Sequence, residues 1–191
     1  ILVDKSVLIP RPETIDLCKW VIQEELHDKQ ILDIGTGSGL IALFLKRHSK
    51  NCTIHAWDNS KNALRIAIKN ADQNNLDVNF NNIDILKNQS IKTKFDLIVS
   101  NPPYVKNLDF KNLDDDIIKY EPKKALDGGL DGLSEIRKVI IRSSELIKYH
   151  GKLILEIAYD QKNEVKKILT SNNFYINKVA KDFAQKDRCI I

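Results

Sequence analysis

The feature that most constrains the fold is a short apolar run that stops at a cluster of glycines. The run Ile31–Ile34 (Ile-Leu-Asp-Ile) reads as a buried strand, and Gly35, Gly37 and Gly39 follow it directly. Apolar residues then recur at helical spacing over 39–48. A strand that passes through a glycine-rich turn into a helix leaves free backbone N–H groups and the positive end of a helix dipole at the turn. A ligand is therefore expected to bind there.

Alternating strand and helix patterns continue along the chain. Short apolar runs are repeatedly followed by longer segments with apolar residues at helical spacing. Strands are predicted at 31–34, 53–57, 78–83, 95–100, 152–157, 174–179 and 188–191, and helices at 13–26, 39–48, 60–74, 133–149 and 163–171. Ser60 and Ser134 are the expected N-caps of two of these helices. The alternation predicts an α/β fold with a doubly wound, mostly parallel sheet and helices on both faces.

Length and composition are those of one globular domain without a membrane segment. The chain has 191 residues, 42% hydrophobic and 29% charged, and no apolar run approaches the roughly 18 residues that a membrane span needs. The three cysteines show no CxxC spacing and the four histidines are scattered, so we expect reduced thiols and no metal site. With a net charge of +4 and scattered lysines, no nucleic-acid groove is expected. We expect a cytoplasmic monomer.

Acidic residues follow two further predicted strands, at the edge where parallel sheets bind ligands. Asp58 lies 23 residues beyond Gly35, and an acidic residue about 20 positions beyond a glycine loop commonly binds ribose hydroxyls. Asp84 and its neighbour Ile85 follow the third strand. A turn or cap role is the alternative for both aspartates. Together with the loop, Asp58 indicates a ligand that contains a ribose.

The glycine spacing distinguishes two kinds of such ligand. A dinucleotide fingerprint has its third small residue at position 40, where this chain has Leu40, and a nicotinamide dehydrogenase is therefore disfavoured. The GxGxG spacing instead resembles motif I of the S-adenosylmethionine-dependent methyltransferases. This resemblance implies that S-adenosyl-L-methionine is the cofactor, with S-adenosyl-L-homocysteine as product, and that Asp84 and Ile85 meet the adenine. The loop residues expected to hold it are Gly35, Thr36, Gly37, Ser38 and Gly39.

The tetrapeptide Asn101-Pro102-Pro103-Tyr104 ends the buried run 95–100. The lone pair of an amide or aromatic amine nitrogen is delocalised, so such a nitrogen must be held close to an electrophile, with its N–H groups accepted by fixed oxygens. The Asn101 side chain and the Pro102 carbonyl offer two acceptors, and consecutive prolines stiffen the backbone. Tyr104 offers a flat apolar face. Although a simple turn is the alternative, we predict catalytic roles for Asn101, Pro102 and Tyr104.

Several longer segments resemble one known family, the release-factor glutamine N5-methyltransferases (the HemK/PrmC family). The resemblance covers nearly the whole chain. Its segments are LIPRPET (8–14), ILDIGTGSG (31–39), VSNPPY (99–104), EPxxAL (121–126), GGxDGL (128–133) and a late strand (153–157) with Gln161. The tetrapeptide alone also occurs in adenine-N6 methyltransferases, which act on DNA or RNA. The PRPET and EPxxAL segments favour the glutamine enzymes.

The family resemblance implies a fold, a reaction and a partner. The fold is a Rossmann-like methyltransferase sheet of seven strands, with the last strand antiparallel. The reaction is methylation of the side-chain amide nitrogen (N5) of the glutamine in the Gly-Gly-Gln motif of peptide-chain release factors. Asn101 would also contact the cofactor, Glu121 and Pro122 would order the long polar segment 105–131, and Arg11 and Glu13 would border the acceptor pocket. A salt-bridged helix entry is the alternative for the last two. The residues expected to hold the glutamine are Asn101, Pro102, Pro103, Tyr104, Arg11 and Glu13.

Residues 1–191 are expected to form the catalytic domain of such an enzyme. Members of the family carry a small helical domain before the PRPET segment, and we expect this chain to lack it and to grip its protein substrate less tightly. Ile15 and Ala158 depart from the family pattern, at positions outside the acceptor tetrapeptide. The competing hypotheses are an adenine-N6 methyltransferase and a cofactor-binding module without catalysis.

Overall fold

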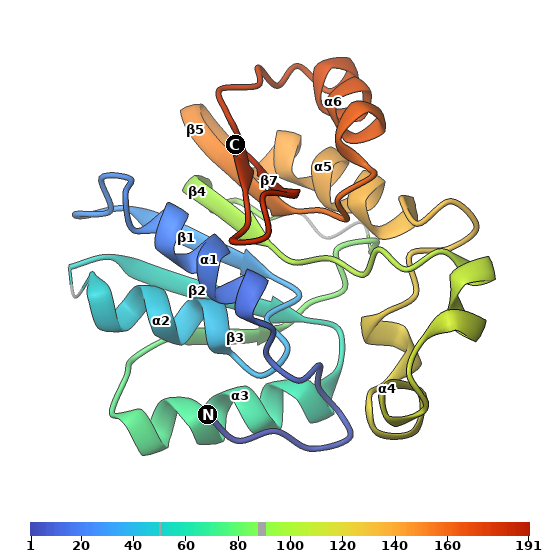
Figure 1. The fold of residues 1–191 in the computed structure, drawn as a ribbon. Coiled ribbons are helices and arrows are strands. Elements are labelled where there is room, and N and C mark those ends of the chain that lie inside the picture. The colour runs from blue at the N-terminus through green and yellow to red at the C-terminus, as the bar shows by residue number, and fades with distance from the viewer. Residues whose placement is uncertain (50, 88–90) are drawn as a thin grey trace.

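The computed structural model describes residues 1–49, 51–87 and 91–191, which form a twisted sheet between two layers of helices (Figure 1). The seven-stranded sheet has the order β3-β2-β1-β4-β5-β7-β6. β7 runs antiparallel to its neighbours β5 and β6, and the other neighbouring strands are parallel. The predicted fold class is confirmed. The strands are β1 (Gln30–Ile34), β2 (Thr53–Asp58), β3 (Asn79–Asn82), β4 (Phe95–Ser100), β5 (Ile147–Glu156), β6 (Val179–Lys181) and β7 (Asp187–Ile190).

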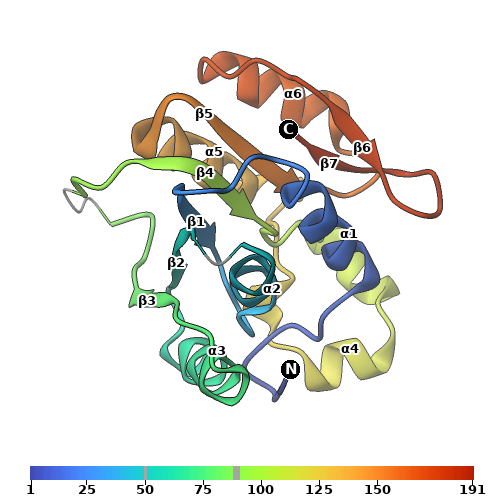
Figure 2. The same ribbon diagram turned by 90° about the vertical axis from the view of Figure 1, so that its left-hand side faces the viewer.

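Helices cover both faces of the sheet, as Figure 2 shows from the side. One face carries α1 (Pro12–Val21), α2 (Leu40–His48) and α3 (Lys61–Asn74), and the other carries α5 (Ser134–Leu146) and α6 (Lys162–Ser171). The segment between β4 and α5 holds the short helices η1 (Asn107–Asn112), α4 (Asp115–Tyr120) and η2 (Lys123–Ala125). No helix in the described ranges is long and apolar enough to span a membrane.

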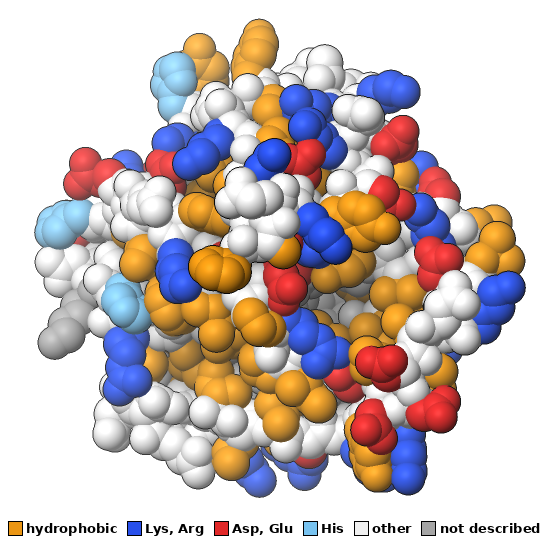
Figure 3. All heavy atoms as spheres, in the orientation of Figure 1, with side chains coloured by type: hydrophobic (Ala, Val, Ile, Leu, Met, Phe, Trp, Pro, Cys, Tyr) orange, Lys and Arg blue, Asp and Glu red, His pale blue; other side chains and the backbone are white. Residues whose placement is uncertain are grey.

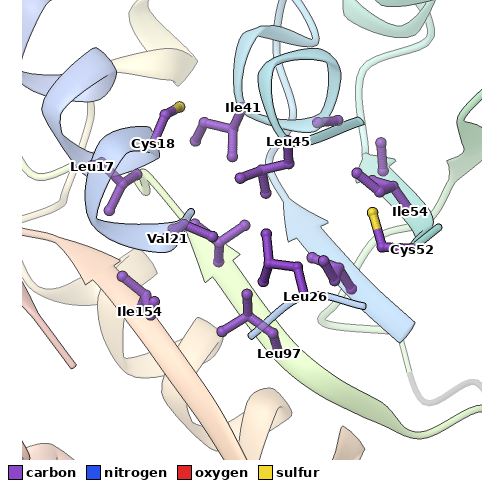
Figure 4. Close-up of a cluster of buried hydrophobic side chains, with 14 of the residues drawn as sticks. Leu17, Cys18, Val21, Leu26, Ile41, Leu45, Cys52, Ile54, Leu97 and Ile154 are labelled. Atoms are coloured by element: carbon purple, nitrogen blue, oxygen red, sulfur yellow. The ribbon is translucent and has the colours of Figure 1, made fainter. Parts of the chain in front are cut away.

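The strands divide their side chains between two cores because successive residues point to opposite faces. Leu97 of β4 packs in the cluster beneath α1 and α2, and its neighbour Ile98 packs in the cluster beneath α5 and α6. Figure 4 shows Leu17 and Val21 of α1 directed at this first cluster. Each fully buried aliphatic side chain contributes about 1.5 to 3 kcal/mol. The two cores hold the strand ends in fixed positions.

Two N-cap predictions have different outcomes. Ser60 caps α3 as predicted, because its hydroxyl oxygen accepts the Ala63 N–H at 3.2 Å. The prediction for Ser134 is wrong, since this residue is already the first of α5 and makes no capping hydrogen bond. The Leu133 N–H at that helix start is instead accepted by the carboxylate of Asp131 at 3.0 Å.

Some predicted boundaries also differ from the structure. α1 ends at Val21 rather than at 26, and β5 begins at Ile147 rather than at 152, with a register shift opposite Phe95 and Leu97. The strand predicted at 174–179 was placed too early, because β6 covers only Val179–Lys181. The alternating apolar residues at its start pack against the second core without joining the ladder.

Candidate active site

A cavity of about 1330 Å³ lies at the carboxyl ends of the central strands. Its walls come from the residues after β1, β2, β3 and β4, from the segment before α1 and from η2. This is where parallel sheets bind ligands. Most of the residues singled out in the sequence line it, namely Gly35, Thr36, Gly37, Ser38, Asp58, Asp84, Ile85, Asn101, Pro102 and Pro103. Gly39, Tyr104, Arg11 and Glu13 are not among the lining residues.

The glycine loop turns sharply at the end of β1 and leaves one side open. Gly35 and Gly37 have φ of 75° and 56°, a region that favours glycine. The N–H groups of Gly35 and Thr36 donate to the Trp57 carbonyl at 2.8 and 3.0 Å, which fixes the loop against β2. A Cβ at Gly35 would meet no heavy atom within 4 Å. The loop therefore exposes backbone to the cavity.

Gly39 has a different structural reason from the other glycines of the loop. It precedes α2 with φ of 84°, and a Cβ there would lie 3.1 Å from the Cβ of Ala67 in α3. The residue thus lets α2 approach α3 closely. The structure gives Gly39 a packing role, and its predicted contact with a cofactor stays a prediction.

Asp58 joins the glycine loop to the start of α3. One carboxylate oxygen accepts the Gly37 N–H at 3.0 Å, and the other accepts the Ser60 N–H at 2.8 Å. Burial raises the pKa of Asp58 above its usual value, an effect that these bonds oppose. Each oxygen keeps a further lone pair for a ligand hydroxyl. Asp58 can therefore hold the loop and accept from a ribose at once.

Asp84 forms a side-chain turn, the role given above as the alternative to ligand binding. Its carboxylate accepts the Leu86 N–H at 3.0 Å, two residues later. Asp84 and Ile85 nevertheless line the cavity, beside Ile83. Turn formation and ligand contact are compatible at this position.

Asp33 is a fully buried carboxyl beneath the glycine loop. It accepts a hydrogen bond from the Thr36 hydroxyl at 2.7 Å, and its other oxygen has no partner among the described residues. Burial raises its pKa from 3.8 to about 7. Asp33 is placed to stiffen the loop rather than to meet a ligand.

Asn101 is held by a chain of buried and partly buried hydrogen bonds at the cavity wall. Its side-chain N–H donates to the Thr14 hydroxyl at 3.0 Å, and Thr14 donates to the Glu156 carboxylate at 3.0 Å. The other oxygen of Glu156 accepts from the Tyr104 hydroxyl at 3.2 Å. Burial has the largest effect on both groups: it raises the pKa of Glu156 to about 7, and it also raises the pKa of Tyr104. The chain joins the first turn of α1 to the ends of β4 and β5.

Arg11 forms an ion pair with Glu121, whose side chain is only 2% exposed. The pair joins the entry of α1 to the segment after α4, so Arg11 adopts the salt-bridged arrangement that was its alternative interpretation. Through this pair Glu121 ties the long segment to the entry of α1, and its expected role in ordering that segment stays a prediction. Glu13 lies near enough to Glu156 and Tyr104 for its charge to raise their pKa values.

Sequence reasoning missed three polar residues of this region. The sequence patterns include Thr14 only within the LIPRPET segment and assign no role to Glu156 or Gln161. Gln161 is buried and donates to the carbonyls of Gly132 and Tyr104 at 3.0 and 3.3 Å, and it accepts the Ala158 N–H. The available signal was a polar residue at the end of an apolar strand, which the late strand shows at Glu156.

Other kinds of site receive no support in the part of the chain that the structure describes. No group of three or more His, Cys, Asp or Glu is arranged to hold a metal there. Cys18, Cys52 and Cys189 are buried free thiols, as expected. On the face drawn in Figure 3, basic and acidic side chains are interspersed among hydrophobic ones. That face does not carry the continuous basic groove that nucleic-acid binding calls for.

Comparison with protein families and curated proteins gives consistent matches. The methyltransferase small domain family matches residues 15–178. A release factor glutamine methyltransferase of Flavobacterium psychrophilum is 45% identical over 65% of this chain and 45% of that protein. Proteins of the same name from Clostridium acetobutylicum and Agrobacterium fabrum are 38% and 35% identical over 99% and 100% of this chain, and each is covered over 68% of its length. The chain spans about half the length of the first of these curated relatives.

Solved structures share the fold at low sequence identity. The ribosomal protein L11 methylase of Lactobacillus delbrueckii subsp. bulgaricus superposes with a TM-score of 0.70 at 19% identity, over 97% of this chain and 81% of that one. The Mtq2–Trm112 complex of E. cuniculi, described as responsible for the methylation of the eRF1 translation termination factor, gives a TM-score of 0.67 at 24% identity, over 97% and 96%. At these identities the likeness concerns the fold.

Proposed function

Because the chain belongs to the methyltransferase small domain family, and within it to the release factor glutamine methyltransferases, we propose that it methylates the side-chain amide nitrogen (N5) of a glutamine. The substrate is the Gly-Gly-Gln motif of peptide-chain release factors. Residues 1–191 act as the catalytic domain. The observation that carries the proposal is that Asn101 and Pro102 line the same cavity as the open glycine loop.

The residues around the glycine loop fit S-adenosyl-L-methionine. Gly35 and Gly37 present bare backbone to the cavity, and Asp58 keeps acceptor capacity for ribose hydroxyls. Asp84 and Ile85 form the wall proposed for the adenine. When bound, this cofactor supplies an electrophilic methyl group on a sulfonium centre. The residues of the chain then have to place a weak nucleophile and exclude competing geometries.

Asn101 and Pro102 are the acceptors proposed for the two N–H groups of the glutamine amide. The Asn101 side-chain N–H is occupied by Thr14, so its oxygen remains available to the cavity. Pro102 has a fixed φ, and its carbonyl is held by the stiff Pro102-Pro103 backbone. Holding the nitrogen in line in this way converts an encounter into a near-attack geometry. No strong base is required for that placement.

Three further residues act around the acceptor pocket in this proposal without lining the cavity, namely Tyr104, Arg11 and Glu13. Tyr104 is anchored through its hydroxyl to Glu156 and packs against the second core. Arg11 is held by Glu121 and sets the position of the segment 121–126. Their contribution is to shape the pocket that admits the glutamine side chain.

The test is transfer of labelled methyl from S-adenosyl-L-methionine to a release factor, beside a copy with the motif glutamine changed to alanine. We expect one added methyl on the glutamine and none on the altered copy, by mass spectrometry. Equal labelling of both proteins would overturn the proposal. Duplex DNA and RNA serve as a third arm, in which label transfer would instead support the adenine-N6 alternative.

A further inference from the structure

Three separate parts of the protein meet in a largely buried series of hydrogen bonds beside the cavity, which Thr14 and Asn101 line. Thr14 comes from the first turn of α1, Asn101 from the end of β4 and Glu156 from the end of β5. Thr14 is 5% exposed and Glu156 is fully buried. Which group donates and which accepts at each of these hydrogen bonds follows from the chemistry of Glu156.

The carboxylate fixes the direction at one end. An ionised Glu accepts hydrogen bonds and donates none, so the hydroxyls of Thr14 and Tyr104 must both donate to Glu156. A threonine hydroxyl has a single hydrogen. Since Thr14 gives that hydrogen to Glu156, it can only accept from Asn101.

The amide orientation of Asn101 follows from this. Only the nitrogen of an asparagine side chain can donate, so its NH₂ group faces Thr14 and its oxygen faces the other way. In the reverse orientation, Asn101 would turn an NH₂ group towards the NH₂ group of an incoming amide. Two donors facing each other across a partly buried contact leave both unpaired, at a cost comparable to a lost hydrogen bond.

We propose that Thr14 and Glu156 are positioning residues that orient the Asn101 amide so that its oxygen faces the acceptor nitrogen. The inference rests on the proposed function for the identity of the acceptor. The geometry itself depends only on this chain. Thr14 stands two residues after Pro12, whose fixed φ suits the first turn of a helix, so its place beside Glu156 is set by the start of α1.

Burial is the largest influence on the Glu156 carboxyl and raises its pKa to about 7, so the direction derived above applies to the ionised form above that pH. Arg188 favours the ionised carboxyl by its charge and bonds to Asp182 and the Ile157 carbonyl rather than to Glu156 itself. Glu13 acts in the opposite sense. The thiols of Cys18 and Cys189 also lie close, and their pKa values are raised by burial and by the charge of Glu156. These thiols stay neutral.

The decisive variants are Thr14→Val and Thr14→Ser. Valine keeps the shape of threonine but removes the hydroxyl, and serine keeps the hydroxyl but removes the methyl group. In single-turnover transfer to a release factor, we expect Thr14→Val to lower the rate by about 10- to 100-fold and Thr14→Ser by no more than about 3-fold. The Kd for S-adenosyl-L-methionine should be unchanged in both. Wild-type rates in Thr14→Val, or equal losses in both variants, would overturn the proposal.

A second measurement needs no substrate. In the ¹⁵N-labelled chain, the side-chain NH₂ of Asn101 is assigned by its disappearance in Asn101→Asp. Its exchange with solvent should be slow in the wild type and in Thr14→Ser and at least about 10-fold faster in Thr14→Val. Identical exchange in all three would overturn the orientation. If the wild type transferred no methyl, the proposed function would fail, and this exchange comparison alone would decide the orientation.

Discussion

The side-chain amide of Asn101 donates to the hydroxyl of Thr14 at 3.0 Å, although 87 residues separate them in the chain. Asn101 directly follows the central strand β4, and Thr14 lies in the first turn of α1. A residue at the cavity is thus oriented by a helix that packs on one face of the sheet. A substitution in either element should therefore change the orientation of the Asn101 side-chain oxygen.

Asn101→Ala should lower methyl transfer by about 100-fold or more, because it removes a fixed acceptor at the reacting nitrogen. Cofactor affinity should change by less than about 3-fold, since the loop 35–39 is untouched. Rapid-quench transfer and calorimetric titration of the cofactor measure the two effects. Normal transfer by this variant would show that the acceptor role assigned to Asn101 is wrong.

Transfer should fall as the pH drops through about 7, the value to which burial raises the pKa of Glu156. Once protonated, this carboxyl can donate to Thr14, and Thr14 is then free to turn its hydrogen towards Asn101. The measurement is single-turnover rate between pH 6 and 8.5 at saturating cofactor. Glu156→Gln is the control and should give a lower rate with no step near pH 7. A step that survives in this variant would assign the titration to another group.

Asp33→Asn should stabilise the protein at alkaline pH. The folded-state pKa of Asp33 is raised by burial from 3.8 to about 7, so the folded state binds this proton more tightly than the unfolded state. Its contribution to stability is present below pH 4 and is lost as the pH rises to 7. At pH 8 the variant should gain about 1 to 3 kcal/mol in urea unfolding, with little gain at pH 5. An equal gain at both pH values would contradict this assignment.

Gly35→Ala and Gly132→Ala should separate ligand binding from folding. At Gly35 a Cβ meets nothing within 4 Å, so the positive φ costs only about 1 kcal/mol while a methyl group enters the cavity and weakens cofactor binding. At Gly132 a Cβ would lie 2.6 Å from the Tyr104 carbonyl oxygen, and unfolding should cost about 2 to 4 kcal/mol less. Thermal unfolding and cofactor titration test both. Similar profiles for the two variants would refute the distinction.

Arg11→Met should destabilise the chain by about 1 to 3 kcal/mol, because it leaves the buried Glu121 carboxylate without its counter-charge. Adding Glu121→Gln should restore much of the loss, since the buried group is then neutral. Urea unfolding of the two variants supplies the comparison, and limited proteolysis of 105–126 reports the loss of order in that segment. A double variant no more stable than Arg11→Met would mean that the ion pair does not set the effect.

The sheet and its ligand edge were predictable because both are local patterns. Alternating apolar runs identified the strands, and Ser60 marked the start of α3. Prediction was less successful where a segment alternates without pairing. The stretch 174–178 has the pattern of a strand, but Phe174 and Ile176 pack on the second core as irregular chain before β6 begins.

The hydrogen-bond chain behind Asn101 lay beyond local patterns for a physical reason. Thr14 and Glu156 are 142 residues apart and meet only because α1 packs beside β5. A buried carboxylate gives no periodic signal, and its partners depend on the tertiary fold. The N-cap prediction for Ser134 was wrong for a related reason, because the Asp131 carboxylate already accepts the Leu133 N–H at the start of α5.

The cofactor side and the acceptor side of the cavity draw on differently distributed parts of the sequence. Apart from Asn101, the residues proposed to meet the cofactor fall in the stretch 35–85, whereas the orientation of Asn101 depends on segments that begin at Pro12 and end near Glu156. Selection can therefore act on the two sides separately. A lineage that keeps the first stretch intact and alters three short distant segments would retain its methyl donor while acquiring a new acceptor.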